Sequence, residues 1–124
     1  MRYFSLLTAT NTPDGPPPGA LMAAIAALGE DANSAGVLLD TAGLAPSAKG
    51  ARIELSGGTI GVIDGPFTEA KELISYAIYQ VASKEEAVEW ATRFMDLHLR
   101  HWPGWEGNTV VLKVFGPEDF GQQN

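Results

Sequence analysis

Hydrophobic and polar residues alternate over residues 2–10, a pattern that predicts a first β-strand. A segment rich in proline, residues 11–19, ends this strand, and apolar residues then recur at helical spacing over residues 18–33. The helical positions are Leu21, Ala24, Ile25, Leu28 and Ala32. Gly36 suits the C-terminal cap of this helix, and we expect a second strand to begin at Val37.

The next unit is predicted to be a tight β-hairpin, because Gly57-Gly58 supplies two adjacent residues that accept positive φ. Pairing across this turn places four apolar side chains on one face, with Leu55 opposite Ile60 and Ile53 opposite Val62. Arg52 and Glu54 then fall on the other face of the hairpin.

A strand over residues 73–82 carries bulky side chains on both faces, which is typical of a strand covered on both sides. Ile74, Tyr76 and Ile78 share one face, and Leu73, Ala77, Tyr79 and Val81 share the other. Ser83 and Glu86 then form a capping box that starts a second helix. We expect a last strand over residues 109–115 and a polar C-terminal tail over residues 116–124.

The order β-α-β-β-β-β-α-β predicts a ferredoxin-like α+β fold in one domain, residues 1–124, with an antiparallel sheet and two helices on one face. The other sheet face still presents Tyr, Leu and Val side chains, and an apolar face of that size usually meets a partner. A second copy is the simplest cover, so we expect a homodimer with a cavity between two sheets, as in a dimeric α/β barrel.

Composition narrows the function classes. The 124 residues carry a net charge of -7 with only 8 Lys and Arg, which excludes a basic groove for nucleic acid. No segment approaches the ~20 apolar residues of a membrane span, and no signal peptide is evident, so we expect a cytoplasmic protein. The absence of cysteine removes thiol chemistry and Cys-ligated metals. No phosphate loop or dinucleotide fingerprint is present, and we expect no cofactor.

The connection that follows the hairpin concentrates charge beside a turn made by Gly65 and Pro66. Its residues are Asp64-Gly65-Pro66-Phe67-Thr68-Glu69-Ala70-Lys71-Glu72. This run resembles the signature of the YCII-related, or DGPF-domain, family. Three other segments fit the same family: Leu44-Ala-Pro46 ahead of the hairpin, Glu86-Ala-Val-Glu-Trp-Ala91, and Phe115-Gly-Pro-Glu-Asp-Phe120.

The resemblance implies a ferredoxin-like subunit that dimerises into an α/β barrel, without fixing a biochemical activity. A few relatives are linked to small-molecule lyase or isomerase chemistry, and others resemble accessory proteins of sigma factors. The branch with a His–Asp pair carries its histidine near the first helix, whereas residues 18–33 contain none here. Asp64 is present, but the histidine of that His–Asp pair is missing from this helix.

The candidate catalytic residues come from the Asp64–Glu72 run. Asp64 is either a general base or an acceptor for backbone amides of its own turn, and the turn role is favoured. Glu69 and Lys71 are an ion pair or solvated rim in one interpretation and ligand contacts in the other. Glu72 leads into the buried strand, so burial in the cavity would raise its pKa and make it a proton carrier.

Four further side chains are candidate ligand contacts. Arg52 is able to hold a carboxylate through two parallel hydrogen bonds, or to pair with Glu54 or Glu69. Phe67 packs the turn onto the core in the simpler interpretation. Tyr76 and Tyr79 lie on opposite faces of one strand, so one hydroxyl is expected to face the cavity, unless both are core residues with satisfied hydroxyls.

The only two histidines, His98 and His101, are three positions apart near the end of the second helix. This spacing suits metal ligands, but no third ligand is evident, so a cation that stabilises the helix dipole is preferred and we predict no metal. Trp90, Trp102 and Trp105 are interpreted as packing residues and not as a platform for nucleic-acid bases.

The sequence therefore predicts a cytoplasmic homodimer with a small-molecule pocket between its sheets. Any chemistry there would be carboxylate acid/base chemistry, such as isomerisation, elimination or hydrolysis, with Asp64 and Glu72 as the candidate catalytic residues. The alternative is a non-catalytic ligand-sensing or accessory protein, with a sigma factor as its partner.

Overall fold

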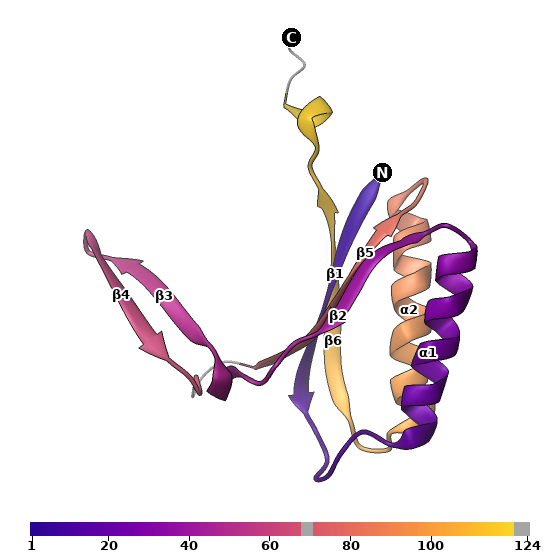
Figure 1. Ribbon diagram of the computed structural model, residues 1–124, viewed down its shortest axis with the longest axis horizontal. Coiled ribbons are helices and arrows are strands. Elements are labelled where there is room, and N and C mark those ends of the chain that lie inside the picture. Colours follow the sequence, from indigo (N-terminus) through magenta and orange to yellow (C-terminus); the bar gives the residue numbers. More distant parts are fainter. Residues whose placement is uncertain (68–70, 121–124) are drawn as a thin grey trace.

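The chain folds into one layer of antiparallel sheet, one layer of helices and a separate hairpin (Figure 1). The computed structural model describes residues 1–67 and 71–120. In chain order the helices and strands are β1 (Arg2–Asn11), α1 (Gly19–Ser34), β2 (Leu38–Gly43), β3 (Ala51–Ser56), β4 (Thr59–Asp64), β5 (Glu72–Gln80), α2 (Lys84–His101) and β6 (Glu106–Val114). Single 3₁₀ turns lie at Ser47–Lys49 and Pro117–Asp119.

The four-stranded sheet has the order β2-β5-β1-β6, with β1 antiparallel to both of its neighbours. This is the strand order of a ferredoxin-like fold, and it confirms the predicted α+β class with both helices on one face. The hairpin β3–β4 forms a second sheet of its own. In chain order it lies between β2 and β5, which pair directly with each other in the four-stranded sheet. Among the described residues, no helix is long and apolar enough to cross a membrane.

Alternation along β1 decides which residues enter the core. Tyr3, Leu7 and Ala9 are buried beneath the helices, while Phe4 and Leu6 are only partly covered on the opposite face. The other core residues come from α1, β5 and α2 and from the ends of β2 and β5: Leu21, Ala32, Val37, Tyr79, Val81, Ala87 and Ala91.

The predicted caps form at Gly36 and Ser83, but the return bond of the capping box goes to the amide of Ala82 and not to that of Ser83. Gly36 has φ +74°, and the amide of Val37 donates to the carbonyl of Ala32 at 3.0 Å, which closes the last turn of α1. Ser83 accepts a hydrogen bond from the amide of Glu86 at 3.1 Å, and Glu86 accepts one from the amide of Ala82 at 2.9 Å.

The hairpin register is confirmed, with Leu55 opposite Ile60 and Ile53 opposite Val62. Several boundaries differ from prediction by one to three residues, and one side chain lies on another face than predicted. The helix α1 begins after Pro18, β5 ends at Gln80, and β6 begins at Glu106. Leu73 was predicted to share a face with Tyr79, which is wrong: a bulge shifts the register so that Leu73 lies opposite Thr8 and is 49% exposed.

The structure describes the first part of the predicted C-terminal tail, residues 116–120. Pro117–Asp119 is a 3₁₀ turn whose Asp119 carboxylate accepts a hydrogen bond from the amide of Gly116 at 2.7 Å. The ring of Phe120 meets the ring of Phe115 edge to face at 5.2 Å between centroids. Residues 121–124 lie outside the described residues.

Candidate functional site

A hollow of about 470 Å³ lies at the root of the hairpin, where the chain leaves β2, turns into β3 and later enters β5. We call it the root hollow. It collects four of the candidate residues named from the sequence, Arg52, Phe67, Lys71 and Glu72. Its remaining lining residues are Leu44, Ala45, Pro46, Ser47, Lys49, Gly50, Ala51 and Leu73.

Glu72 is fixed to the opposite wall of the root hollow by Ser47. The amide of Ser47 donates to Oε1 of Glu72 at 2.8 Å, and the hydroxyl of Ser47 donates to Oε2 at 2.7 Å. These two bonds hold the pKa of Glu72 below its ordinary value, because both stabilise the charged carboxylate. The expected rise of this pKa through burial is therefore wrong: hydrogen bonding outweighs desolvation, and Glu72 is ionised at neutral pH.

Arg52 lies between an aromatic ring and a carboxylate. Its guanidinium carbon is 4.9 Å from the centroid of the Phe67 ring, a cation–π geometry. Its Nε is 3.2 Å from Oε2 of Glu54, which confirms one of the two partners expected for it. Phe67 thus holds the guanidinium at the wall of the root hollow.

The root hollow is basic although the whole chain is acidic. Lys49, Arg52 and Lys71 are three of the eight basic residues of the chain, and Glu72 is the one acidic residue among the described lining residues. The three cations exceed by one the negative charges of Glu72 and of Glu54, which pairs with Arg52, so the local potential favours an anionic ligand.

Asp64 is the last residue of β4 and lies opposite Ala51, exposed to solvent and outside the lining of the root hollow. The next residue, Gly65, donates its amide hydrogen to the carbonyl of Gly50 at 2.9 Å. A Cβ at Gly65 would collide with the carbonyl oxygen of Ser47, so only glycine fits there. Both interpretations of Asp64, turn residue and general base, stay predictions. Glu69 lies outside the described residues.

The two tyrosines of β5 are not brought to the root hollow. Tyr79 faces the helices, and burial raises the pKa of its hydroxyl. Tyr76 lies on the open face of the sheet, where its hydroxyl donates to Oδ2 of Asp40 at 2.8 Å, a bond that raises the pKa of Tyr76. Its ring stacks on Phe4 with 5.9 Å between centroids. The sequence predicted that these tyrosines separate onto two faces, and this is confirmed.

A smaller cavity of about 90 Å³ lies between the sheet and the two helices. Its walls are mainly apolar, from Ile25 and Leu28 of α1, Trp90 and Phe94 of α2, and Leu7 of β1. The lining also includes the polar side chains of Ser5, Thr41, Ser75 and Tyr79, but the space is smaller than the root hollow and none of its described lining residues is charged, so we take the root hollow as the candidate site.

His98 is a packing residue. It is 5% exposed, its ring lies 4.6 Å from the Trp105 ring and 4.9 Å from the Phe94 ring between centroids, and Nδ1 is 3.0 Å from the carbonyl oxygen of Phe94. Burial lowers the pKa of His98, so the expected dipole-stabilising cation is wrong for this residue. Within residues 1–67 and 71–120, no group of three potential ligands gathers around a metal position.

This burial predicts a loss of stability in acid. Unfolded His98 takes up a proton near its ordinary pKa of 6.5, whereas the folded form does so only at lower pH. Between these two values the unfolded state binds more protons, so the free energy of unfolding falls as the pH drops below about 6.5. Urea unfolding at a series of pH values measures this slope. We expect His98→Gln to flatten it more than the control His101→Gln; equal slopes in the two variants would contradict the account.

Sequence reasoning missed two contributors to the root hollow, Ser47 and Lys49. Both lie in the 3₁₀ turn that follows Pro46, a segment without hydrophobic periodicity. The signal that pointed toward them was the Leu44-Ala-Pro46 segment, which marks a fixed turn just ahead of the hairpin.

Comparison with known proteins gives one match. The family model of the YCII-related domain matches residues 1–94, about three quarters of the chain, which includes the β1–α1, α1–β2 and β5–α2 connections and the whole root hollow. None of the curated proteins matches the chain.

Proposed function

This chain belongs to the YCII-related domain family, and we propose that it works as a homodimer that binds a small organic carboxylate in the root hollow. The observation that carries the proposal is the gathering of Lys49, Arg52 and Lys71 around one hollow in a chain of net charge -7. An anion held there gains Coulomb attraction from the positive charge that remains after Glu54 and Glu72 are counted, and a guanidinium matches the two oxygens of a carboxylate.

The rest of the lining favours an organic body over a bare inorganic ion. Leu44, Ala45, Pro46, Phe67 and Leu73 contribute apolar surface to the same hollow. Leu44 and Leu73 are 41% and 49% exposed, so a ligand that covers them removes apolar surface from water. A few charged groups set into a mainly apolar wall are typical of small-molecule sites.

The geometry supports binding more strongly than proton transfer. Both oxygens of Glu72 accept hydrogen bonds from Ser47, and the lowered pKa makes this carboxylate a poor proton acceptor near neutral pH. We therefore assign Glu72 a positioning role: it joins the start of β5 to the turn that carries Ser47. Asp64 remains the candidate base for any acid/base chemistry at this end of the hairpin.

The open face of the four-stranded sheet supports the dimer part of the proposal. Phe4, Leu6, Tyr76 and Ile78 are partly exposed there, and Val110 and Leu112 of β6 are 45% and 60% exposed. The register places these residues side by side, Phe4 between Ile78 and Leu112, and Leu6 between Tyr76 and Val110. A contiguous apolar face on this scale is characteristic of a protein interface, and a second copy brings the same face.

Isothermal titration calorimetry with benzoate, succinate and inorganic phosphate tests whether the root hollow binds anions. We expect benzoate and succinate to bind, and Lys71→Gln to weaken them about tenfold, the loss of one charge-assisted contact worth about 1.4 kcal/mol. Lys84→Gln, at the start of α2, is the matched control. Binding that is absent, or equally weakened by both variants, would show that the root hollow is not the site.

A further inference from the structure

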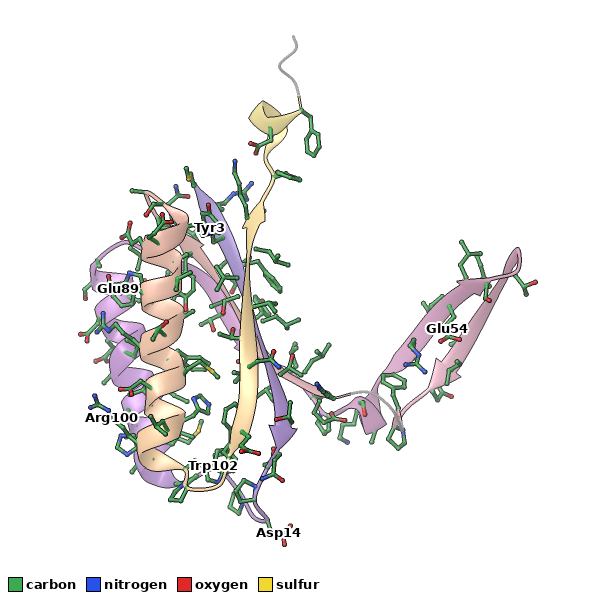
Figure 2. The ribbon with its side chains drawn as sticks, turned by 180° about the vertical axis from the view of Figure 1, so that it is seen from behind. Tyr3, Asp14, Glu54, Glu89, Arg100 and Trp102 are labelled. Atoms are coloured by element: carbon green, nitrogen blue, oxygen red, sulfur yellow. The ribbon has the colours of Figure 1, made fainter. Side chains whose placement is uncertain are left out.

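The hairpin β3–β4, which we call the arm, exposes a row of large apolar side chains. Ile53, Leu55, Ile60 and Val62 lie on one face and are 71%, 74%, 69% and 68% exposed. The opposite face carries Arg52 and Glu54. Figure 2 shows Glu54 on the arm, on the far side of the sheet from Glu89 and Arg100 of α2.

Among the residues that the structure describes, none forms a layer that covers the arm. Beyond isolated contacts, neither of its strands packs against a helix or against the four-stranded sheet. A two-stranded hairpin alone in water is marginally stable, and three or more strands or a packing partner are needed for independent stability. The well-formed register and the apolar row therefore require a surface that the single chain does not supply.

The root of the arm holds it away from its own sheet. Glu72 is bonded to Ser47, the amide of Leu44 donates to the carbonyl of Ile74 at 2.8 Å, and Gly65 donates to Gly50 at 2.9 Å. These contacts connect the two ends of the arm to β5 and to each other. Figure 1 shows the result: the arm projects from the sheet on the side opposite the helices.

We infer that the arm lies on a second copy of this chain, with its apolar row against that copy. This inference rests on the proposed dimer and adds the arm to its interface. The second copy also carries net charge -7, and an apolar contact such as this row joins two acidic chains without placing like charges against each other.

The size of the exposed surfaces agrees with this assignment. Strands about 4.8 Å apart with about 3.3 Å per residue give the open sheet face a flat area of roughly 570 Å² and the arm roughly 200 Å². A standard interface needs about 800 Å² per partner. The sheet face and the arm together come to roughly 770 Å², close to that value, whereas the sheet face alone gives roughly 570 Å².

The arm also bears on the ligand site, because Ala51 and Arg52 belong to both the arm and the lining of the root hollow. A second copy that lies along the arm extends over the root, where Leu44 and Leu73 are exposed. The partner then closes the root hollow, and the complete site exists only in the dimer.

A pair of substitutions on the two faces of β4 tests the arm contact. Ile60 lies in the apolar row and Ile63 on the opposite face. We expect Ile60→Lys to raise the dimer dissociation constant about 100-fold in sedimentation equilibrium, because it buries an unpaired charge at the contact. Ile63→Lys is the matched control and should leave the constant within about threefold of the parent. An unchanged constant in folded Ile60→Lys, verified by circular dichroism, overturns the inference.

A cross-linking experiment tests whether the arm contacts a second copy, without any substitution in the apolar row. The chain has no cysteine, so Thr59→Cys at the tip of the arm accepts a single benzophenone label. Labelled chain is mixed with ¹⁵N-enriched chain, the subunits are exchanged, and the products of irradiation are identified by mass spectrometry. Cross-links from the labelled tip to the heavy chain support the inference. Cross-links confined to the tip's own chain, or none to the heavy chain, overturn it.

These outcomes separate the inference from the proposed function. If carboxylates bind and the protein sediments at twice 13.1 kDa while the tip reaches only its own chain, the proposed function stands and the arm contact fails. If the tip reaches the heavy chain but no carboxylate binds, the arm contact stands and the proposed ligand fails. A different protein captured by the apolar row in place of the second copy also counts against the inference.

Discussion

Replacing Gly65 with alanine is expected to abolish carboxylate binding and to destabilise the protein by about 1–3 kcal/mol, the usual cost of overpacking. The position has no room for a Cβ, which would collide with the carbonyl oxygen of Ser47, a backbone atom that moves only if the whole turn moves. That turn carries both donors to Glu72. A shift of the turn therefore breaks the contacts that shape the root hollow and fix the direction of the arm.

Gly61→Ala is the matched control for this experiment. Gly61 lies in the same strand region, has an ordinary φ, and a Cβ there meets nothing within 4 Å. Urea unfolding and benzoate titration on both variants give the comparison. We expect binding and stability to fall in Gly65→Ala alone. A Gly65→Ala protein that binds benzoate with parental affinity would contradict the idea that the root is rigid and closely packed.

Leu112→Lys is expected to dissociate the dimer, with the dissociation constant raised at least about 100-fold. Leu112 lies on the open face of the sheet opposite Phe4 and is 60% exposed in the single chain. A lysine at this position is well solvated in the monomer but loses its hydration between two sheets. The monomer should remain folded, because Leu112 contributes little to the core beneath the helices.

Leu99→Lys is the control for this prediction, since Leu99 is 79% exposed on α2, in the helix layer. Sedimentation equilibrium of the two variants separates an effect of the open face from a general effect of added charge. A monomeric Leu112→Lys protein beside a dimeric Leu99→Lys protein is the expected result. If both variants remain dimers, the open face is not the interface.

Local sequence was sufficient for most elements of the fold. The Gly57-Gly58 turn fixed the hairpin register because only one pairing gathers all four apolar residues on one face. The helix α2 followed from Ser83 and its apolar spacing. Leu73 was misplaced because a bulge in β5 is decided by pairing with β1, more than sixty residues away in sequence.

The sequence predicted only part of the candidate site. The motif named Phe67, Lys71 and Glu72, but the partner that determines the chemistry of Glu72 is Ser47, 25 residues earlier in the chain. Because that contact exists only in the folded chain, burial was the one effect on the pKa of Glu72 that the sequence suggested. Hydrogen bonding to the charged form acts in the opposite direction and prevails.

The central claim, a carboxylate site in the root hollow, is tested most directly by a ¹H–¹⁵N NMR titration of the protein with benzoate. The account predicts shifts that saturate at the amides of Lys49, Arg52, Phe67 and Leu73, with α1 and α2 unchanged. Shifts confined to residues around the small cavity under the helices, such as Ile25 and Trp90, or no saturable shifts at all, would contradict it.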